Sequence, residues 1–220
     1  MDQHTRASFD EQLRELQQEL LRMGGVVEQM LFMCVKALVE RDVALADETI
    51  NMDDIVDGYN LDIETHCLRL LALQQPMARD LRTIAAVLKI ITDVERMGDY
   101  AVDIAKTAKI LAEKPLFKPL VDIPRMAEIV QRMLRESLQA FVNHDTALLE
   151  QIVTEDDAVD NYNRALTDEL VGYMEKNPSV VYQAMRLILI VRYLERIADH
   201  ITNVCERVYY METGTLKELH

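Results

Sequence analysis

Carboxylate side chains recur at four-residue intervals in the first half of this 220-residue sequence. They are Asp53 and Asp57, followed further along by Glu95, Asp99 and Asp103. A spacing of i, i+4 and i+8 places side chains on one face of a helix, one per turn. Carboxylates stacked in this way repel one another unless a positive group joins them, and oxygen-only ligation favours Mg, Ca, Mn or Fe(III). The spacing therefore predicts a metal site.

The second half of the sequence repeats this pattern. Asp156 and Asp160 are followed by Glu195 and Asp199. Asn203 stands where the third carboxylate of the later row would fall, so this row carries one charge fewer. We therefore expect a second metal site that binds its metal differently from the first.

Two other interpretations of the acidic rows remain open. The rows can form a solvated acidic face that is neutralised by arginine, with Arg96 and Arg196 as the nearest candidates. They can also belong to a metal-dependent enzyme, either a phosphohydrolase or a di-iron carboxylate enzyme. Di-iron bundles use Glu-x-x-His motifs, which neither row contains, and no nucleophile–base arrangement is recognisable. We therefore expect a protein that is not an enzyme.

The acidic rows belong to a duplicated sequence. Residues 39–60, VERDVALADETINMDDIVDGYN, match residues 142–163, VNHDTALLEQIVTEDDAVDNYN, at 10 of 22 positions with an offset of 103. VERMGD at 94–99 likewise matches LERIAD at 194–199 with an offset of 100. Because the segments recur in the same order, we expect two copies of one unit. The predicted units span 1–114 and 124–212, with a Pro-rich connection over 115–123.

Each unit is predicted to contain three helices, because apolar residues recur with the helical period of 3.6 residues. The expected helices run roughly over 9–40, 42–73, 78–113, 124–143, 145–175 and 179–211. Asp42 and Asp145 are the expected N-caps of the second helix in each unit. The pair Gly24–Gly25 is expected to kink or interrupt the first helix. The predicted fold class is therefore all-α, with two tandem three-helix bundles related by internal duplication.

Predicted turns bring the acidic rows together. In an antiparallel helical hairpin, residues equally far from the turn lie at the same level. Asp57 lies 18 residues before a turn centred on Gln75–Pro76, and Glu95 lies 19 residues after it. A turn at Asn177–Pro178 gives Asp160 and Glu195 the same match. Both hairpins are therefore predicted to pair one acidic row with the other.

Composition excludes several classes of function. The formal net charge of −14 argues against nucleic-acid binding, which needs clustered Lys and Arg. Cys34, Cys67 and Cys205 form no CxxC pair, so we expect buried, reduced thiols. The polar N-terminus is no signal peptide, and no apolar run is long enough to span a bilayer. We expect a soluble, cytoplasmic protein with no membrane insertion.

The acidic pairs and their neighbours resemble the PhoU family, the phosphate-uptake regulators of bacteria. DDIVDGYN with ERMGDYAVD, and DDAVDNYN with ERIADHITN, carry the resemblance, which covers essentially the whole chain. It implies two three-helix bundles side by side, with multinuclear iron or zinc clusters held on their surface. The metal ligands that it implies are Asp53, Asp57, Glu95, Asp99, Asp156, Asp160, Glu195 and Asp199, with Asp103 extending the first row.

The resemblance also implies a role. Members of this family are negative regulators of the phosphate-starvation response and of phosphate uptake. They are thought to act as adaptors between the ATPase of the phosphate ABC transporter and a sensor histidine kinase, and they are often homodimers. We therefore expect a metal-binding signalling adaptor.

Overall fold

The computed structural model describes residues 3–74, 76 and 78–219, and the described residues contain no strand. Their helices are α1 (Gln3–Glu40), α2 (Val43–Asn51), α3 (Asp53–Gln74), α4 (Arg79–Ala112), α5 (Asp122–Asn143), α6 (Thr146–Lys176), the 3-10 turn η1 (Pro178–Val180) and α7 (Val181–Thr213). The all-α prediction is confirmed, and so are two bundles related by duplication. Helices α1 to α4 make the first repeat, and helices α5 to α7 make the second.

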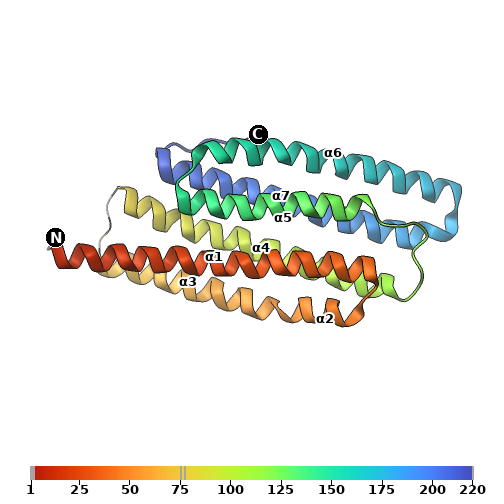
Figure 1. Ribbon diagram of the computed structural model, residues 1–220, viewed down its shortest axis with the longest axis horizontal. Coiled ribbons are helices and arrows are strands. Elements are labelled where there is room, and N and C mark those ends of the chain that lie inside the picture. The colour runs from red at the N-terminus through yellow and green to blue at the C-terminus, as the bar shows by residue number, and fades with distance from the viewer. Residues whose placement is uncertain (1–2, 75, 77, 220) are drawn as a thin grey trace.

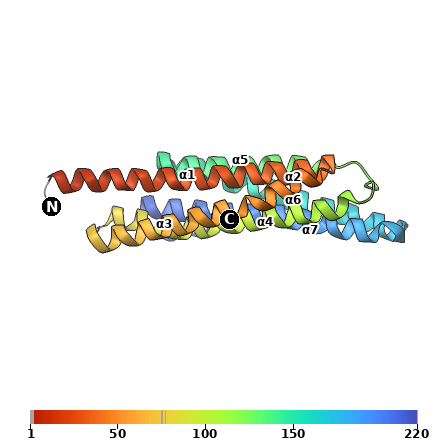
Figure 2. The same cartoon turned by 90° about the horizontal axis from the view of Figure 1, so that it is seen from below.

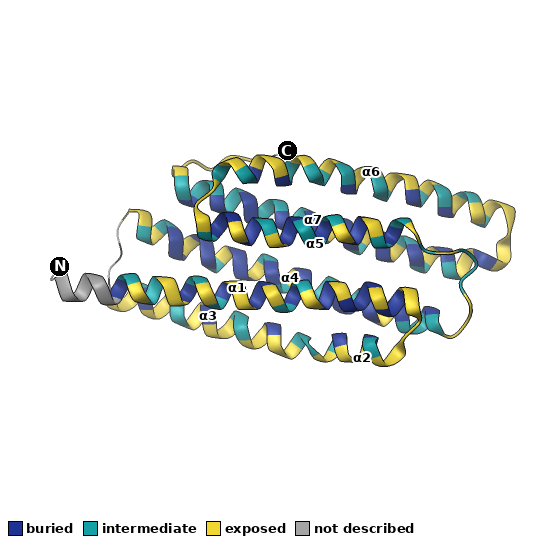
Figure 3. Ribbon diagram, in the orientation of Figure 1, coloured by how far each residue is buried: buried dark blue, intermediate teal, exposed yellow. Residues whose placement is uncertain are grey.

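The two repeats lie side by side with their long axes roughly parallel (Figure 1). Helices α1 and α5 pack against each other, and α4 packs against α7, so both contacts cross from one repeat to the other. Seen from below, α1 and α5 form the upper layer of the picture, and α3, α4 and α7 lie in the layer beneath them (Figure 2). The outer helices α3 and α6 carry mostly exposed and half-buried residues (Figure 3). The shared core therefore lies where α1, α4, α5 and α7 meet.

Both predicted N-caps are present. The side chain of Asp42 accepts a hydrogen bond from the amide of Leu45, and that of Asp145 accepts from the amides of Ala147 and Leu148. Such bonds satisfy amide groups that have no partner within the helix. The two caps start α2 and α6 at equivalent positions, which keeps the acidic rows of the two repeats in register.

The first helix is continuous, so the expected interruption at Gly24–Gly25 is wrong. A Cβ atom added to Gly24 would lie 2.1 Å from Cδ1 of Leu138, a buried residue of α5. Glycine therefore serves here to let α1 approach α5 closely, and the helix needs no break to accommodate it.

The prediction of one continuous helix over 42–73 is wrong in one respect, because the helix is interrupted at Met52. The amide of Met52 donates to the carbonyl of Thr49, three residues back, which tightens the turn and separates α2 from α3. The second repeat has one continuous helix, α6, over the equivalent residues. The predicted turn at 74–76 includes Gln75, which lies outside the described residues.

Two residue pairs between α4 and α7 occupy equivalent positions. In the second pair, each helix supplies the position that the other helix supplies in the first pair. His200 of α7 lies against Asp93 of α4, with 2.9 Å between Nδ1 and Oδ1. By the repeat offset of 100, the equivalent residues are Tyr100 and Tyr193, and their rings stack. An exchange of this kind shows that the repeats are related by an approximate twofold axis between α4 and α7.

Residues 113–121 lie outside the helices and connect α4 to α5. Phe117, in this connection, packs its ring edge against Tyr173 of α6, and its amide donates to the side chain of Gln183 in α7. The connection is thus tied to the second repeat. None of the described helices has an apolar stretch long enough to cross a bilayer.

Candidate metal centres

Asp53 and Asp57 of α3 face Glu95 and Asp99 of α4, and we call these four residues the first acidic cluster. Burial raises the pKa of Asp53, and the negative charges of Asp57 and Asp99 raise it further. Burial is also the main cause of the raised pKa of Glu95, followed by the charge of Asp99. Negative charge in each row thus raises the pKa of a carboxyl group in the other row. The two rows are therefore close together, as their matched distances from the turn predict.

The equivalent residues of α6 and α7 are Asp156, Asp160, Glu195 and Asp199, which we call the second acidic cluster. Burial, followed by the charges of Asp160 and Asp199, raises the pKa of Asp156 to about 6. Three of the four carboxylates line a groove of about 500 Å³ between these helices, and Leu219 from the C-terminal segment borders it. The second cluster is therefore partly enclosed, and its carboxylates bring several negative charges close together.

Glu195 is the most enclosed of these carboxylates. The residue is only 8% exposed, and its Oε2 atom is buried without a hydrogen-bond partner among the described residues. A buried carboxylate oxygen without a partner is unfavourable by about 1–3 kcal/mol or more. A cation at this atom would remove that cost, so the donor set fits a hard metal ion.

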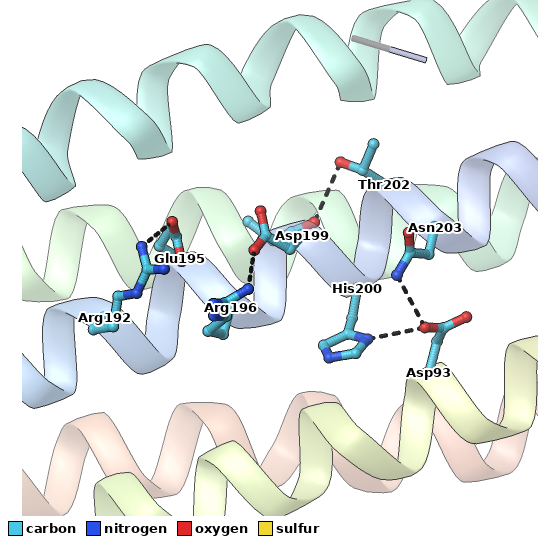
Figure 4. Close-up of polar contacts among 9 residues, drawn as sticks. Asp93, Arg192, Glu195, Arg196, Asp199, His200, Thr202 and Asn203 are labelled. Atoms are coloured by element: carbon cyan, nitrogen blue, oxygen red, sulfur yellow. Dashed lines mark hydrogen bonds and ion pairs between the residues drawn. The ribbon is translucent and has the colours of Figure 1, made fainter. Parts of the chain in front are cut away.

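Arginines approach both clusters. Arg96 donates to Asp99 over 2.9 Å, and Arg196 donates to Asp199 over 3.2 Å. Arg192 donates to Oε1 of Glu195, so the second cluster meets two guanidinium groups (Figure 4). The predicted neutralisation by Arg96 and Arg196 is therefore present as these two ion pairs.

The carboxylates are not gathered around a single point. Among the described residues, no three His, Cys, Asp or Glu side chains are placed to hold one metal ion. The arginine side chains are about half exposed, from 47% for Arg192 and Arg196 to 57% for Arg96, so they are able to turn into solvent. Metal binding at either cluster thus requires the carboxylates and arginines to rearrange.

The third positions of the rows lie beside the interface between α4 and α7. Asn203 donates from Nδ2 to Oδ1 of Asp93 over 3.2 Å, next to the bond between Asp93 and His200 (Figure 4). Burial raises the pKa of Tyr193, and the charge of Asp103 raises it further. Asp103 and Asn203 therefore occupy equivalent places where the two repeats meet.

Three charged residues near the clusters were missed by the sequence analysis. Arg192 bonds to Glu195, the charge of Lys106 lowers the pKa of Asp53, and the charge of Asp157 raises that of Asp156. The spacing of i, i+3 from Arg192 to Glu195 is a recognisable signal for a side-chain pair on one helical face.

Comparison with known proteins gives one consistent result. A family model described as "PhoU domain" matches residues 20–108 and again 123–208. A phosphate-specific transport system accessory protein PhoU homolog from Clostridium acetobutylicum is 39% identical over 217 residues, covering 98% of this chain and 99% of the relative. One from Aquifex aeolicus is 40% identical over 93% of both chains.

Solved structures agree with these sequence matches. The crystal structure of PhoU from Pseudomonas aeruginosa superposes with a TM-score of 0.90 at 35% identity, covering 94% of this chain and 100% of the other. The phosphate transport system regulatory protein PhoU from Streptococcus pneumoniae gives the same TM-score at 34% identity, covering 96% of this chain and 100% of the other.

Proposed function

The chain belongs to the PhoU family, and on that premise we propose that it is an accessory regulator of a phosphate-specific transport system. The observation that carries this proposal is a match to both repeats together with full-length relatives that bear that name. Fold agreement with a PhoU described as a phosphate transport regulatory protein supports it as well. The matches cover both repeats, so the proposed role belongs to the whole chain and not to one repeat alone.

The proposed role is that of a non-catalytic adaptor on the cytoplasmic side of the membrane. It links the ATPase of the phosphate transporter to a sensor histidine kinase, and it holds the phosphate-starvation response in its repressed state. A homodimer belongs to the same proposal. The surface charge of this acidic chain suits partners with basic patches, because complementary charge speeds association.

A deletion strain tests the regulatory role. Without this chain, we expect genes of the phosphate-starvation response to be expressed in phosphate-rich medium, and re-expression of the chain should repress them again. Affinity purification of the tagged chain should enrich the transporter ATPase and the sensor kinase above an untagged control. Unchanged gene expression in the deletion strain would contradict the regulatory role, and failure to enrich either protein would contradict the adaptor role.

Metal binding at the two acidic clusters is the second component of the proposal. The family resemblance points to multinuclear iron or zinc, whereas the carboxylate donors suit Mg, Mn, Ca or Fe(III). A bound cation would supply positive charge to facing carboxylates, and it would meet the unpartnered Oε2 of Glu195. Asp53, Asp57, Glu95 and Asp99 would hold the metal of the first cluster; Asp156, Asp160, Glu195 and Asp199 would hold that of the second.

Elemental analysis of protein purified without chelator tests this component. We expect bound metal in the wild type, about half of it in the Asp53→Asn/Asp57→Asn variant, and little when Asp156→Asn/Asp160→Asn is added. Equal metal content in all three proteins would contradict ligation by these residues. The same preparations should show no turnover of a panel of phosphoesters; turnover lost in Asp99→Ala would favour a metal-dependent phosphohydrolase instead.

A further inference from the structure

The two acidic clusters differ at one position that reaches a proposed ligand. Arg192 lies three residues before Glu195 and bonds to its Oε1 atom. By the repeat offset of 100, the equivalent residue in the first repeat is Thr92, whose hydroxyl donates to the carbonyl of Leu88 in its own helix. Only the second cluster therefore has a guanidinium at this position.

The matching glutamates have different surroundings as a result. The side chain of Glu195 is 11% exposed, whereas that of Glu95 is 23% exposed. Glu95 meets the guanidinium of the adjacent Arg96 at 3.6 Å, a separation too long for a hydrogen bond. Arg192 thus makes a direct charge-assisted bond to a glutamate that the first repeat leaves in a weaker ion pair.

The two carboxylate oxygens of Glu195 have different surroundings. Oε1 accepts from Arg192, and Oε2 is buried without a hydrogen-bond partner among the described residues. The side chain of Glu195 points toward α6, into the second cluster (Figure 4), whereas Arg192 is an exposed residue whose side chain is 47% accessible to solvent. The guanidinium is therefore able to leave along a path through solvent, whereas the carboxylate stays enclosed.

We propose that Arg192 competes with metal for Glu195, so that the second cluster takes up a hard divalent cation only in exchange for this guanidinium. The proposal rests on the metal binding proposed above. A cation and a guanidinium cannot both make close contact with Oε1 without repelling each other. Metal loading of the second cluster thus releases Arg192 from Glu195, a pair that has no counterpart in the first cluster, where Thr92 stands at the equivalent position.

Exchange of residues 92 and 192 tests the competition, with Mn²⁺ as the probe and isothermal titration calorimetry as the measurement. In full-length protein carrying Asp53→Asn/Asp57→Asn, only the second cluster remains, and Arg192→Thr should tighten its binding of Mn²⁺ about tenfold, or about 1.4 kcal/mol. In protein carrying Asp156→Asn/Asp160→Asn, Thr92→Arg should weaken binding at the first cluster.

A matched control removes an arginine of the same spacing elsewhere. Arg125 pairs with Asp122 at 3.2 Å on the exposed start of α5, so Arg125→Thr should leave both Mn²⁺ affinities unchanged. Circular dichroism melting curves check that each variant folds. An Arg192→Thr protein that binds Mn²⁺ no more tightly than its parent would overturn the competition while leaving the proposed metal binding intact. Absence of Mn²⁺ binding in both single-cluster proteins would overturn both proposals.

Discussion

Tyr100 of α4 and Tyr193 of α7 stack across the boundary between the repeats, with ring centroids 5.8 Å apart and planes inclined by 28°. The equivalent pair, with the helices exchanged, is His200 and Asp93, joined by a polar contact. The interface therefore holds an aromatic pair on one side of its approximate axis and a polar pair on the other. Both pairs hold the two repeats against each other, and single substitutions can test how much each pair contributes to stability.

Replacing Asp93 with alanine should weaken the contact between the repeats. Its carboxylate is 15% exposed and meets both His200 and Asn203, so its removal leaves two half-buried polar groups without that partner. We expect a loss of about 1–3 kcal/mol in the free energy of unfolding, measured by urea denaturation. Asp47→Ala, at the more exposed ion pair with Lys109, should lose less than about 1 kcal/mol. Equal losses in the two variants would contradict this account.

Asp156→Asn should change how stability depends on pH. The pKa of Asp156 is about 6 in the folded protein against 3.8 for an ordinary aspartate, so the folded state binds more protons between these values. The wild type should therefore lose stability as pH rises from about 4 to 7. The asparagine variant should lose less, and at pH 7 it should be more stable by about 1 kcal/mol, allowing for solvent screening.

Metal-free protein is needed for this measurement, because a bound cation would reverse the effect by favouring the ionised carboxylate. Melting temperatures at pH 4.5 and pH 7 provide the comparison. Asp62→Asn, at an exposed position of α3, serves as the control and should follow the wild type. An Asp156→Asn variant with the pH profile of the wild type would show that this carboxylate is not the cause.

Alanine at the two adjacent glycines of α1 should have opposite effects. A Cβ atom at Gly25 meets nothing within 4 Å, so Gly25→Ala should stabilise the helix by about 0.5–1 kcal/mol through helix propensity. At Gly24 the same atom would lie 2.1 Å from Leu138, and Leu138 must move within a packed interior. We expect Gly24→Ala to destabilise the protein by about 1 kcal/mol. Thermal melting distinguishes these outcomes, and stabilisation by both alanines would refute the close approach of α1 and α5.

The three cysteines should be unreactive while the protein is folded. Burial raises the pKa of Cys67 and of Cys205 to about 12, and it raises that of Cys34 still further. Because the thiolate is the reactive form, an aromatic disulfide reagent should label the native protein very slowly. All three thiols should react promptly in guanidinium chloride. Rapid labelling of the native protein at pH 7 would show that the helices open far more often than this packing implies.

Much of the fold followed from the sequence because the chain is duplicated. Two caps, Asp42 and Asp145, fixed the start of equivalent helices, and the distances from the turns placed Asp57 opposite Glu95. The break at Met52 was not predicted, because it is seen in the backbone hydrogen bonds of Met52 and no Gly or Pro at this position signals the end of a helix. Continuity of α1 at Gly24 was missed because the reason for the glycine lies in another helix, at Leu138.

Prediction of the candidate site was limited in a different way. Helical spacing shows which side chains share a face, so the acidic rows were found. It does not show which neighbouring helix a row meets along its length, and Asn203 therefore looked like a weakened ligand position. In the structure Asn203 bonds to Asp93 of the other repeat. This hydrogen bond gives Asn203 a structural role where the two repeats meet.

The exchanged contacts of α4 and α7 have a consequence for how the two halves vary. An interface in which residue i meets j and j meets i is isologous, the arrangement of a twofold homodimer. In a homodimer every substitution at such an interface appears twice, and the two sides stay identical. Joining both halves in one chain lifts that constraint, and Asp93 and Tyr193 are indeed different residues at equivalent places. Covalent linkage thus allows the two equivalent contacts to differ in chemistry, one polar and one aromatic.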